Sequence, residues 1–144
     1  WQEWSAAGGG QFAIVSATSK NGVVYGQHAT NGRVYTFQPS VFQDGGSNFS
    51  TVMQTQRSNF GSPYRKYEDT LDIVGDTTTG NLTVEKSDND FSSFETVGTI
   101  DMSSPFKRAT RLGAFYSRSH RFTYADNYAF RVQAWLPGVR MGIG

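Results

Sequence analysis

The sequence predicts an all-β fold, either an antiparallel β-sandwich or a partial propeller blade joined to a sandwich. Aromatic side chains make up 15% of the 144 residues, so few residues can build a core although the hydrophobic content is only 37%. Helix-forming residues are scarce in every window, whereas the 16 glycines and the many Ser, Thr and Asn residues suit frequent turns. Turn signals recur about every ten residues, which is typical of the short strands of sandwiches and barrels.

A repeated unit indicates three short strands in residues 1–40. The segment NGVVY at 21–25 returns as NGRVY at 31–35. Asn-Gly supplies the positive φ that tight hairpins require. The expected strands, over 11–17, 23–27 and 33–38, form a meander in the style of a propeller blade. A single blade cannot bury both of its faces, so the meander must pack on the rest of the chain, on missing blades or on another subunit.

Alternating polar and apolar residues predict further strands after a loop at 39–48. In one of them Leu82 and Val84 alternate with Asn81 and Thr83. The expected strands cover residues 49–56, 64–74, 81–86, 94–100, 106–112, 115–124 and 128–136, which gives about ten in all. Residues 49–136 are therefore sandwich-like, and residues 137–144 form a loose, Gly-rich tail.

These segments are expected to form one all-β domain over residues 1–144, in which the blade-like part passes into the sandwich-like part without a linker. The chain begins with Trp1 and not with Met, so we expect it to be a fragment of a longer protein.

The charge and the absence of cysteine narrow the function classes. A net charge of +1 gives no overall attraction to nucleic acid or to a membrane surface. The chain has no cysteine, which excludes a disulfide-stapled domain, a thiolate metal site and a cysteine nucleophile. No apolar run approaches the roughly 20 residues of a membrane span.

No catalytic or metal-binding constellation stands out. His28 and His120 lie far apart in the sequence, and no nucleophile elbow accompanies either, so both are expected at the surface or at an interface. Glu68, Asp69 and Asp72 are close in sequence, but they suggest a strand end at the surface without a partner carboxylate for glycoside chemistry. We therefore expect no enzymatic activity, no cofactor and no metal.

The densest polar motif is the segment SDNDFSSF at residues 87–94. Its oxygen-bearing side chains alternate as at the start of a calcium loop, but the central glycine and the distant bidentate glutamate are missing. A degenerate Asp-box hairpin fits better, because Asp and Ser side chains readily bond their own backbone in turns. In that interpretation the side chain of Asp90 locks the turn by bonding to its backbone, and the ring of Phe94 is buried as a plug in the core.

Basic and aromatic residues are interleaved in the last 40 residues. The basic ones include Lys107, Arg108, Arg111, Arg118, Arg121 and Arg131. Three environments fit this pattern: a protein interface, solvated strand faces, and nucleic acid with bases stacked on the aromatic rings. The low net charge favours protein over nucleic acid. We expect Arg108, Arg111, Arg118 and Arg121 to face a partner subunit, where an arginine can meet a carboxylate bidentately.

The order of these features resembles the C-terminal regions of β-propeller-like packaged-DNA stabilisation and head-to-tail connector proteins of short-tailed bacteriophages. The matching features are Trp1 and Trp4 before a Gly-rich step, the Gly-x-Val-Tyr strand, the turn at Ser87-Asp88, Phe94, Arg108, Arg111-Leu112-Gly113, Arg118 and Arg121. The resemblance implies a structural role in the virion, a homo-oligomeric ring around the tail axis with other virion proteins as neighbours, assembly in the host cytoplasm, and no catalysis.

A second hypothesis remains open, that of a carbohydrate-binding β-domain with a lectin-like or receptor-binding role. In it Trp1, Trp4, Tyr25 and Tyr35 would stack on sugar faces. The first hypothesis predicts multimers without affinity for glycans, and the second predicts a monomer or small oligomer that binds sugars.

Overall fold

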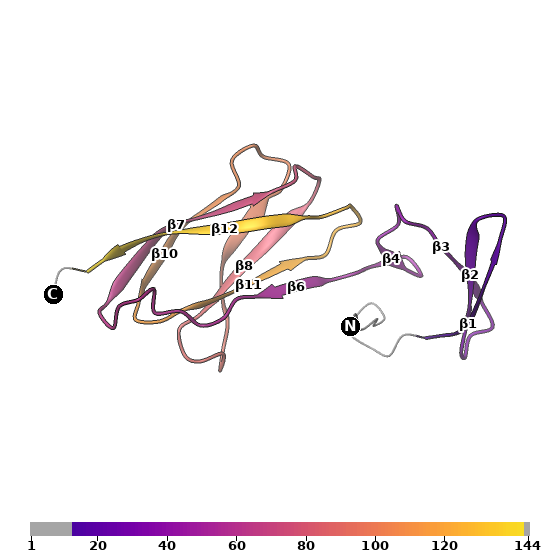
Figure 1. Ribbon diagram of the computed structural model, residues 1–144, viewed down its shortest axis with the longest axis horizontal. Helices are drawn as coiled ribbons and strands as arrows, with labels where there is room; N and C mark the ends of the chain where they lie inside the picture. The colour runs from indigo at the N-terminus through magenta and orange to yellow at the C-terminus, as the bar shows by residue number, and fades with distance from the viewer. Residues whose placement is uncertain (1–12, 143–144) are drawn as a thin grey trace. The chain divides into compact units, whose positions relative to one another are not determined.

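The computed structural model describes residues 13–142 and confirms the all-β prediction, because twelve strands and no helix occur in this range (Figure 1). The chain divides into two compact units. The N-terminal unit comprises Trp1–Ser50 with Asp126–Ala129, and the sandwich unit comprises Thr51–Ala125 with Phe130–Gly144. The division after Ser50 lies just beyond the region, residues 40–49, where the sequence changes from blade-like to sandwich-like.

The N-terminal unit contains the meander that the repeated unit predicts. Its three-stranded antiparallel sheet has the order β1-β2-β3. These strands are β1 (Ile14–Lys20), β2 (Val23–His28) and β3 (Val34–Phe37), and a small hairpin of β4 (Gln43–Asp44) and β5 (Ser47–Asn48) follows. Asn21 and Gly22 both have positive φ, at 52° and 78°, as the tight turn between β1 and β2 requires.

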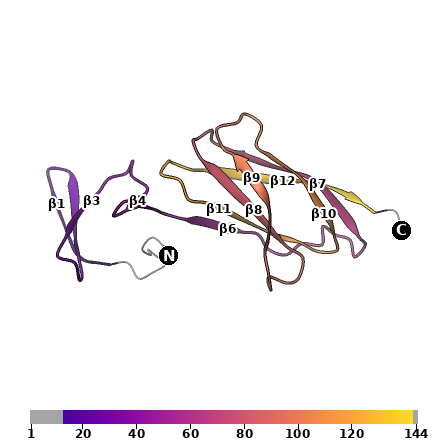
Figure 2. The ribbon, with the colours of Figure 1, turned by 180° about the vertical axis from the view of Figure 1, so that it is seen from behind.

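The sandwich unit consists of two antiparallel sheets that are packed on each other (Figures 1 and 2). One sheet has the order β10-β7-β12, and the other has the order β6-β11-β8-β9. The strands are β6 (Thr51–Gln54), β7 (Lys66–Gly75), β8 (Asn81–Ser87), β9 (Glu95–Asp101), β10 (Arg108–Phe115), β11 (Ser119–Tyr124) and β12 (Val132–Met141).

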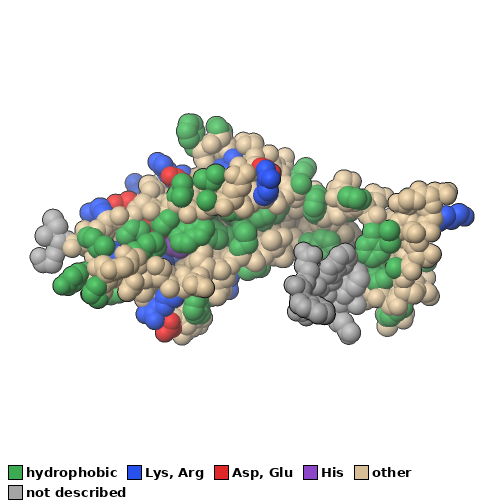
Figure 3. Space-filling view, viewed as in Figure 1, with side chains coloured by type: hydrophobic (Ala, Val, Ile, Leu, Met, Phe, Trp, Pro, Cys, Tyr) green, Lys and Arg blue, Asp and Glu red, His purple; other side chains and the backbone are tan. Residues whose placement is uncertain are grey.

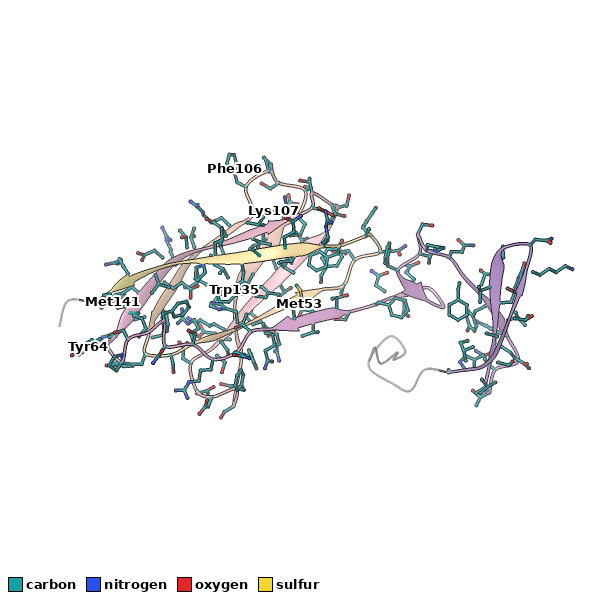
Figure 4. The ribbon with its side chains drawn as sticks, in the orientation of Figure 1. Met53, Tyr64, Phe106, Lys107, Trp135 and Met141 are labelled. Atoms are coloured by element: carbon teal, nitrogen blue, oxygen red, sulfur yellow. The ribbon has the colours of Figure 1, made fainter. Side chains whose placement is uncertain are left out.

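Both sheets contribute side chains to one hydrophobic core. Its buried members are Leu71, Ile73, Leu82, Val84, Ile100, Met102, Leu112, Phe122 and Tyr124. Met53 and Trp135 pack against this cluster, and Figure 4 shows both directed between the two sheets. The opposite case is Phe106, which projects from the loop before β10 and is 86% exposed.

A bulge in β7 decides which of its residues face the core. In the pairing with β12, Gly138 lies opposite Thr70 and Val139 lies opposite Glu68, so Asp69 is an extra residue. Because side chains alternate between the faces of a strand, one extra residue moves the inward face from even to odd positions. Lys66 and Glu68 are therefore buried before the bulge, and Leu71 and Ile73 are buried after it.

The last strand extends further than the sequence analysis predicted. Residues 137–141 were expected to belong to a loose tail, but β12 continues to Met141. Pro137 is tolerated inside this strand because β12 lies at the edge of its sheet, where one side of the backbone needs no partner. Within residues 13–142, no helix is long and apolar enough to cross a membrane.

Candidate functional site

The sandwich unit contains a cluster of buried ionisable side chains beside its hydrophobic core. Glu68, Arg118 and His120 are each at most 1% exposed, and Lys66 is fully buried nearby. Charged groups are seldom buried unless they are paired, so each member must be accounted for by a partner.

Arg118 is the centre of this cluster. Its Nη1 donates to Glu68 Oε2 at 2.9 Å and to the carbonyl oxygen of Leu112 at 3.0 Å. Its Nε and Nη2 donate to the two carboxylate oxygens of Asp88, both at 2.7 Å. The guanidinium carbon also lies 4.3 Å from the centre of the Phe115 ring. Burial by itself lowers the pKa of Arg118, but the hydrogen bonds with Asp88 and Glu68 outweigh it, and the pKa is raised above its ordinary value.

His120 and Glu68 form the inner part of the cluster. His120 Nε2 lies 3.0 Å from Glu68 Oε2, and the carboxylate accepts its hydrogen. The imidazole is stacked near Phe122 and is tilted against Trp135, with ring centres 6.1 and 5.4 Å apart. Within residues 13–142, Glu68 Oε1 and His120 Nδ1 have no hydrogen-bond partner. The pair is closed to solvent, so it cannot act as an accessible acid or base.

Two predictions about these residues are wrong. His120 was expected at the surface or at an interface, and Glu68 was expected at a surface strand end, yet both are buried. The bulge at Asp69 turns Glu68 inward, and Arg118 supplies the charge that makes its burial tolerable. Asp69 and Asp72 do lie on the outer side of the same strand, where their side chains are 53% and 34% exposed.

Arg118 also departs from its predicted role at an interface with a partner subunit. Its side chain is 0% exposed, and its carboxylate partners come from the same chain. Its backbone pairs in both directions with Ser58 at 2.9 Å, which fixes the segment before β7 to the start of β11.

Two further arginines of the predicted interface have partners on neighbouring strands. Arg108 makes a two-pronged contact with Asp72, and Arg121 binds both oxygens of Glu85 at 2.6 and 2.7 Å. These hydrogen bonds raise the pKa of each guanidinium and lower the pKa of each carboxyl. Figure 3 shows this pattern, because basic and acidic side chains lie next to each other over the sandwich unit.

Arg111 differs from the other three. It is exposed, and it lies in a bulge of β10 with a φ of 61°. Among residues 13–142 it forms no ion pair, so of the four predicted interface arginines it is the one whose charge these residues leave available to a partner.

The turn at residues 87–94 is bonded to its own backbone by Ser87, as predicted for its serine, and by Asn89 in place of the predicted Asp90. Ser87 Oγ accepts from the backbone N–H of Phe91, and Asn89 Oδ1 accepts from the backbone N–H of Ser93. Asp90 instead contacts Arg57 at 2.9 Å, and Asp88 binds the buried Arg118. The two aspartates are thus held by arginines and do not lock the turn.

Phe94 is half-buried and does not plug the core. Its ring lies under the guanidinium of Arg121, whose central carbon is 3.9 Å from the ring centre. Within the described residues, no group of three or more His, Cys, Asp or Glu side chains could hold a metal ion.

Of the four aromatic residues proposed for sugar stacking, the two that the structure describes, Tyr25 and Tyr35, are not brought together. Tyr35 is paired with Gly26, and Tyr25 is paired with Thr36, so the two tyrosines point to opposite faces of the β1-β2-β3 sheet. Tyr35 instead receives a hydrogen bond from Asn31 at 3.2 Å. Trp1 and Trp4 lie outside the described residues.

An open groove lies on the sandwich unit next to the buried cluster. Its volume is about 580 Å³, and it is lined by Arg57, Ser58, Asn59, Pro63, Tyr116 and Ser117. Sequence reasoning missed it, because its two walls are separated by more than fifty residues in the chain. The backbone pairing between Ser58 and Arg118 brings these walls together.

The comparisons with protein families and curated proteins identify no relative of this chain. No protein-family model matches the chain, and no curated protein matches it with statistical significance. The function has therefore to be argued from the residues and their geometry.

Proposed function

We propose that this chain is a non-enzymatic structural module that acts through protein–protein interfaces, as part of a phage tail or head-to-tail connector. The virion setting rests on the sequence resemblance. The physical support comes from the N-terminal unit, whose residues from 13 onward form a sheet with little buried apolar surface.

The single observation that carries the proposal is that almost no residue of this unit is buried among those whose burial the structure describes. Gly26 is its only buried residue among those whose burial the structure describes. A side chain at Gly26 would meet Phe37 and Ile14, at 2.7 and 2.8 Å from an added Cβ, so these two apolar side chains cover one face of the sheet. Val24, on the same face, is still 40% exposed. A sheet that is apolar on one face must bury that face against another element.

A second copy of the chain would supply that layer, which fits the homo-oligomeric ring that the resemblance implies. Other virion proteins would then adjoin the ring. Nucleic acid is a poorer partner, because Arg108 and Arg121 are already neutralised by carboxylates of the same chain. Catalysis is not part of the proposal, since His120 and Glu68 are closed to solvent. The sugar-stacking alternative has no supporting observation at Tyr25 and Tyr35, which lie on opposite faces.

The test is the oligomeric state of the full chain, measured by size-exclusion chromatography with light scattering from micromolar to millimolar concentration. We expect multimers in the wild type. Val24→Asp places a charge on the apolar sheet face and should shift the protein towards monomers. Val34→Asp is the matched control, because Val34 is 64% exposed and lies on the opposite face of the same sheet.

A wild type that stays monomeric throughout, or Val24→Asp and Val34→Asp proteins with equal assembly, would contradict the proposal. Circular dichroism of each variant separates loss of assembly from loss of fold.

A further inference from the structure

We propose that the groove between residues 57–63 and residues 116–117 of the sandwich unit binds a neutral oligosaccharide. The groove is open and has a volume of about 580 Å³, which accommodates a few sugar rings. This inference concerns other residues than the assembly role does, and it replaces the expectation that an assembly module has no affinity for glycans.

The walls of the groove are held rigidly, as a recognition site requires. Ser58 and Arg118 exchange two backbone hydrogen bonds of 2.9 Å, and the side chain of Arg118 is anchored in the buried ionic cluster. Phe60 packs edge-on against Phe115, with ring centres 5.7 Å apart. Phe60 and the following Gly61 form a turn in which both residues have positive φ.

Two hydrogen-bond donors at the groove have no partner within the described part of the chain. Arg57 uses Nε for Ser117 Oγ at 2.6 Å and Nη1 for Asp90 at 2.9 Å, which leaves Nη2. Asn59 uses Oδ1 to accept from the N–H of Gly61 at 3.1 Å, which leaves its amide nitrogen. Each remaining donor belongs to a side chain whose other atoms are fixed, so it can bind a sugar hydroxyl at little entropic cost.

Tyr116 supplies the aromatic surface. It lines the groove, and its side chain is 64% exposed. Covering the apolar ring of an exposed tyrosine is energetically favourable, so this ring is available to stack on a ligand. The apolar face of a pyranose ring can cover such a ring while its hydroxyls meet the polar groups beside it. Ser58 and Ser117 add hydroxyls to the same lining.

The charge of the lining selects against other ligands. Among the described residues of the lining, Arg57 is the only ionised side chain, and Asp90 offsets its charge at 2.9 Å. An anionic sugar, a phosphate or a nucleic acid would therefore meet little net positive potential. A peptide would need deep apolar pockets for its side chains, whereas Pro63 is the only purely apolar residue in the lining. A neutral, hydroxyl-rich ligand matches this surface best.

The experiment screens the full chain on a printed array of neutral and acidic glycans and then measures affinities by saturation-transfer NMR and calorimetry with the best neutral ligand. We expect Tyr116→Ala to lower the affinity about tenfold or more, because it removes the stacking surface. Tyr116→Phe, which keeps the ring, should retain most of the affinity. Phe106→Ala is the matched control, since this aromatic residue is 86% exposed and does not line the groove.

Binding that depends on the ring of Tyr116 and on Asn59, tested as Asn59→Ala, supports the proposal. Three results would overturn it: no binding to any neutral glycan, binding that Tyr116→Ala leaves unchanged, or binding confined to acidic glycans and polyanions. Circular dichroism and the unfolding midpoint of each variant establish that a loss of binding is not a loss of fold. Multimer formation in the same samples reports on the assembly role separately.

Discussion

Replacing Glu68 with alanine tests the buried ionic cluster most directly. Both the Glu68 and the Arg118 side chains are 0% exposed, and they are joined at 2.9 Å. Breaking a buried pair by removing one partner costs about 3–5 kcal/mol of stability, because the remaining charge stays buried. Asp88 still binds two donors of Arg118, so we expect a loss near the lower end, about 3 kcal/mol. With a urea m-value of about 2 kcal/mol per M, the unfolding midpoint falls by about 1.5 M.

The assay is urea unfolding at pH 7, followed by circular dichroism. Asp72→Ala is the matched control, because Asp72 belongs to the same strand but forms an exposed pair with Arg108, and exposed pairs contribute little. The unfolding midpoint of Glu68→Gln should lie between those of Glu68→Ala and Asp72→Ala. The amide oxygen of Gln still accepts a hydrogen bond from Arg118, but the negative charge is lost. An unfolding midpoint of Glu68→Ala that equals that of Asp72→Ala would show that the buried pair contributes no more stability than the exposed pair.

Three further outcomes are expected. The hydrogen bond with Arg121 lowers the pKa of Glu85 below 4.5 in the folded state, so the wild type loses stability as the pH falls from 4.5 through that lowered pKa. Glu85→Gln should lose less stability over this range. An equal loss of stability of the two proteins in acid titrations would contradict this. Millimolar calcium should leave the melting temperature unchanged, because both aspartates of residues 87–94 are bonded to arginines, and a rise of several degrees would reveal a site. Gly75→Ala should lower stability by about 1–3 kcal/mol, since its Cβ would collide with the backbone carbonyl oxygen of Arg131; an unchanged urea midpoint would show that the strand can relax.

The fold class and the position of the meander follow from local patterns in the sequence. Asn21-Gly22 predicts a tight hairpin because few other residue pairs tolerate two consecutive positive φ values, and both residues have them. The alternation of Leu82 and Val84 with polar residues predicts a strand with one buried face, and β8 buries both. These are local properties, set by backbone sterics and by the period of the strand, so they can be inferred without knowing the neighbouring strands.

Which charged residues are buried depends on contacts between segments that are distant in the chain. A single extra residue, Asp69, reverses the face of β7 and turns Glu68 inward, and nothing in the local pattern marks this bulge. Arg118 and Arg121 look alike in the sequence, yet Arg118 lies in the interior and Arg121 covers Phe94.

The same reason explains why the candidate groove could not be predicted. Its walls come from residues 57–63 and 116–117, which meet because Ser58 pairs with Arg118 across the chain. The bidentate arginine–carboxylate contacts expected at a partner subunit occur between neighbouring strands of this chain, as between Arg108 and Asp72. Strand order and register bring such groups together. Both depend on contacts between distant segments, so neither can be inferred from the sequence pattern of one segment.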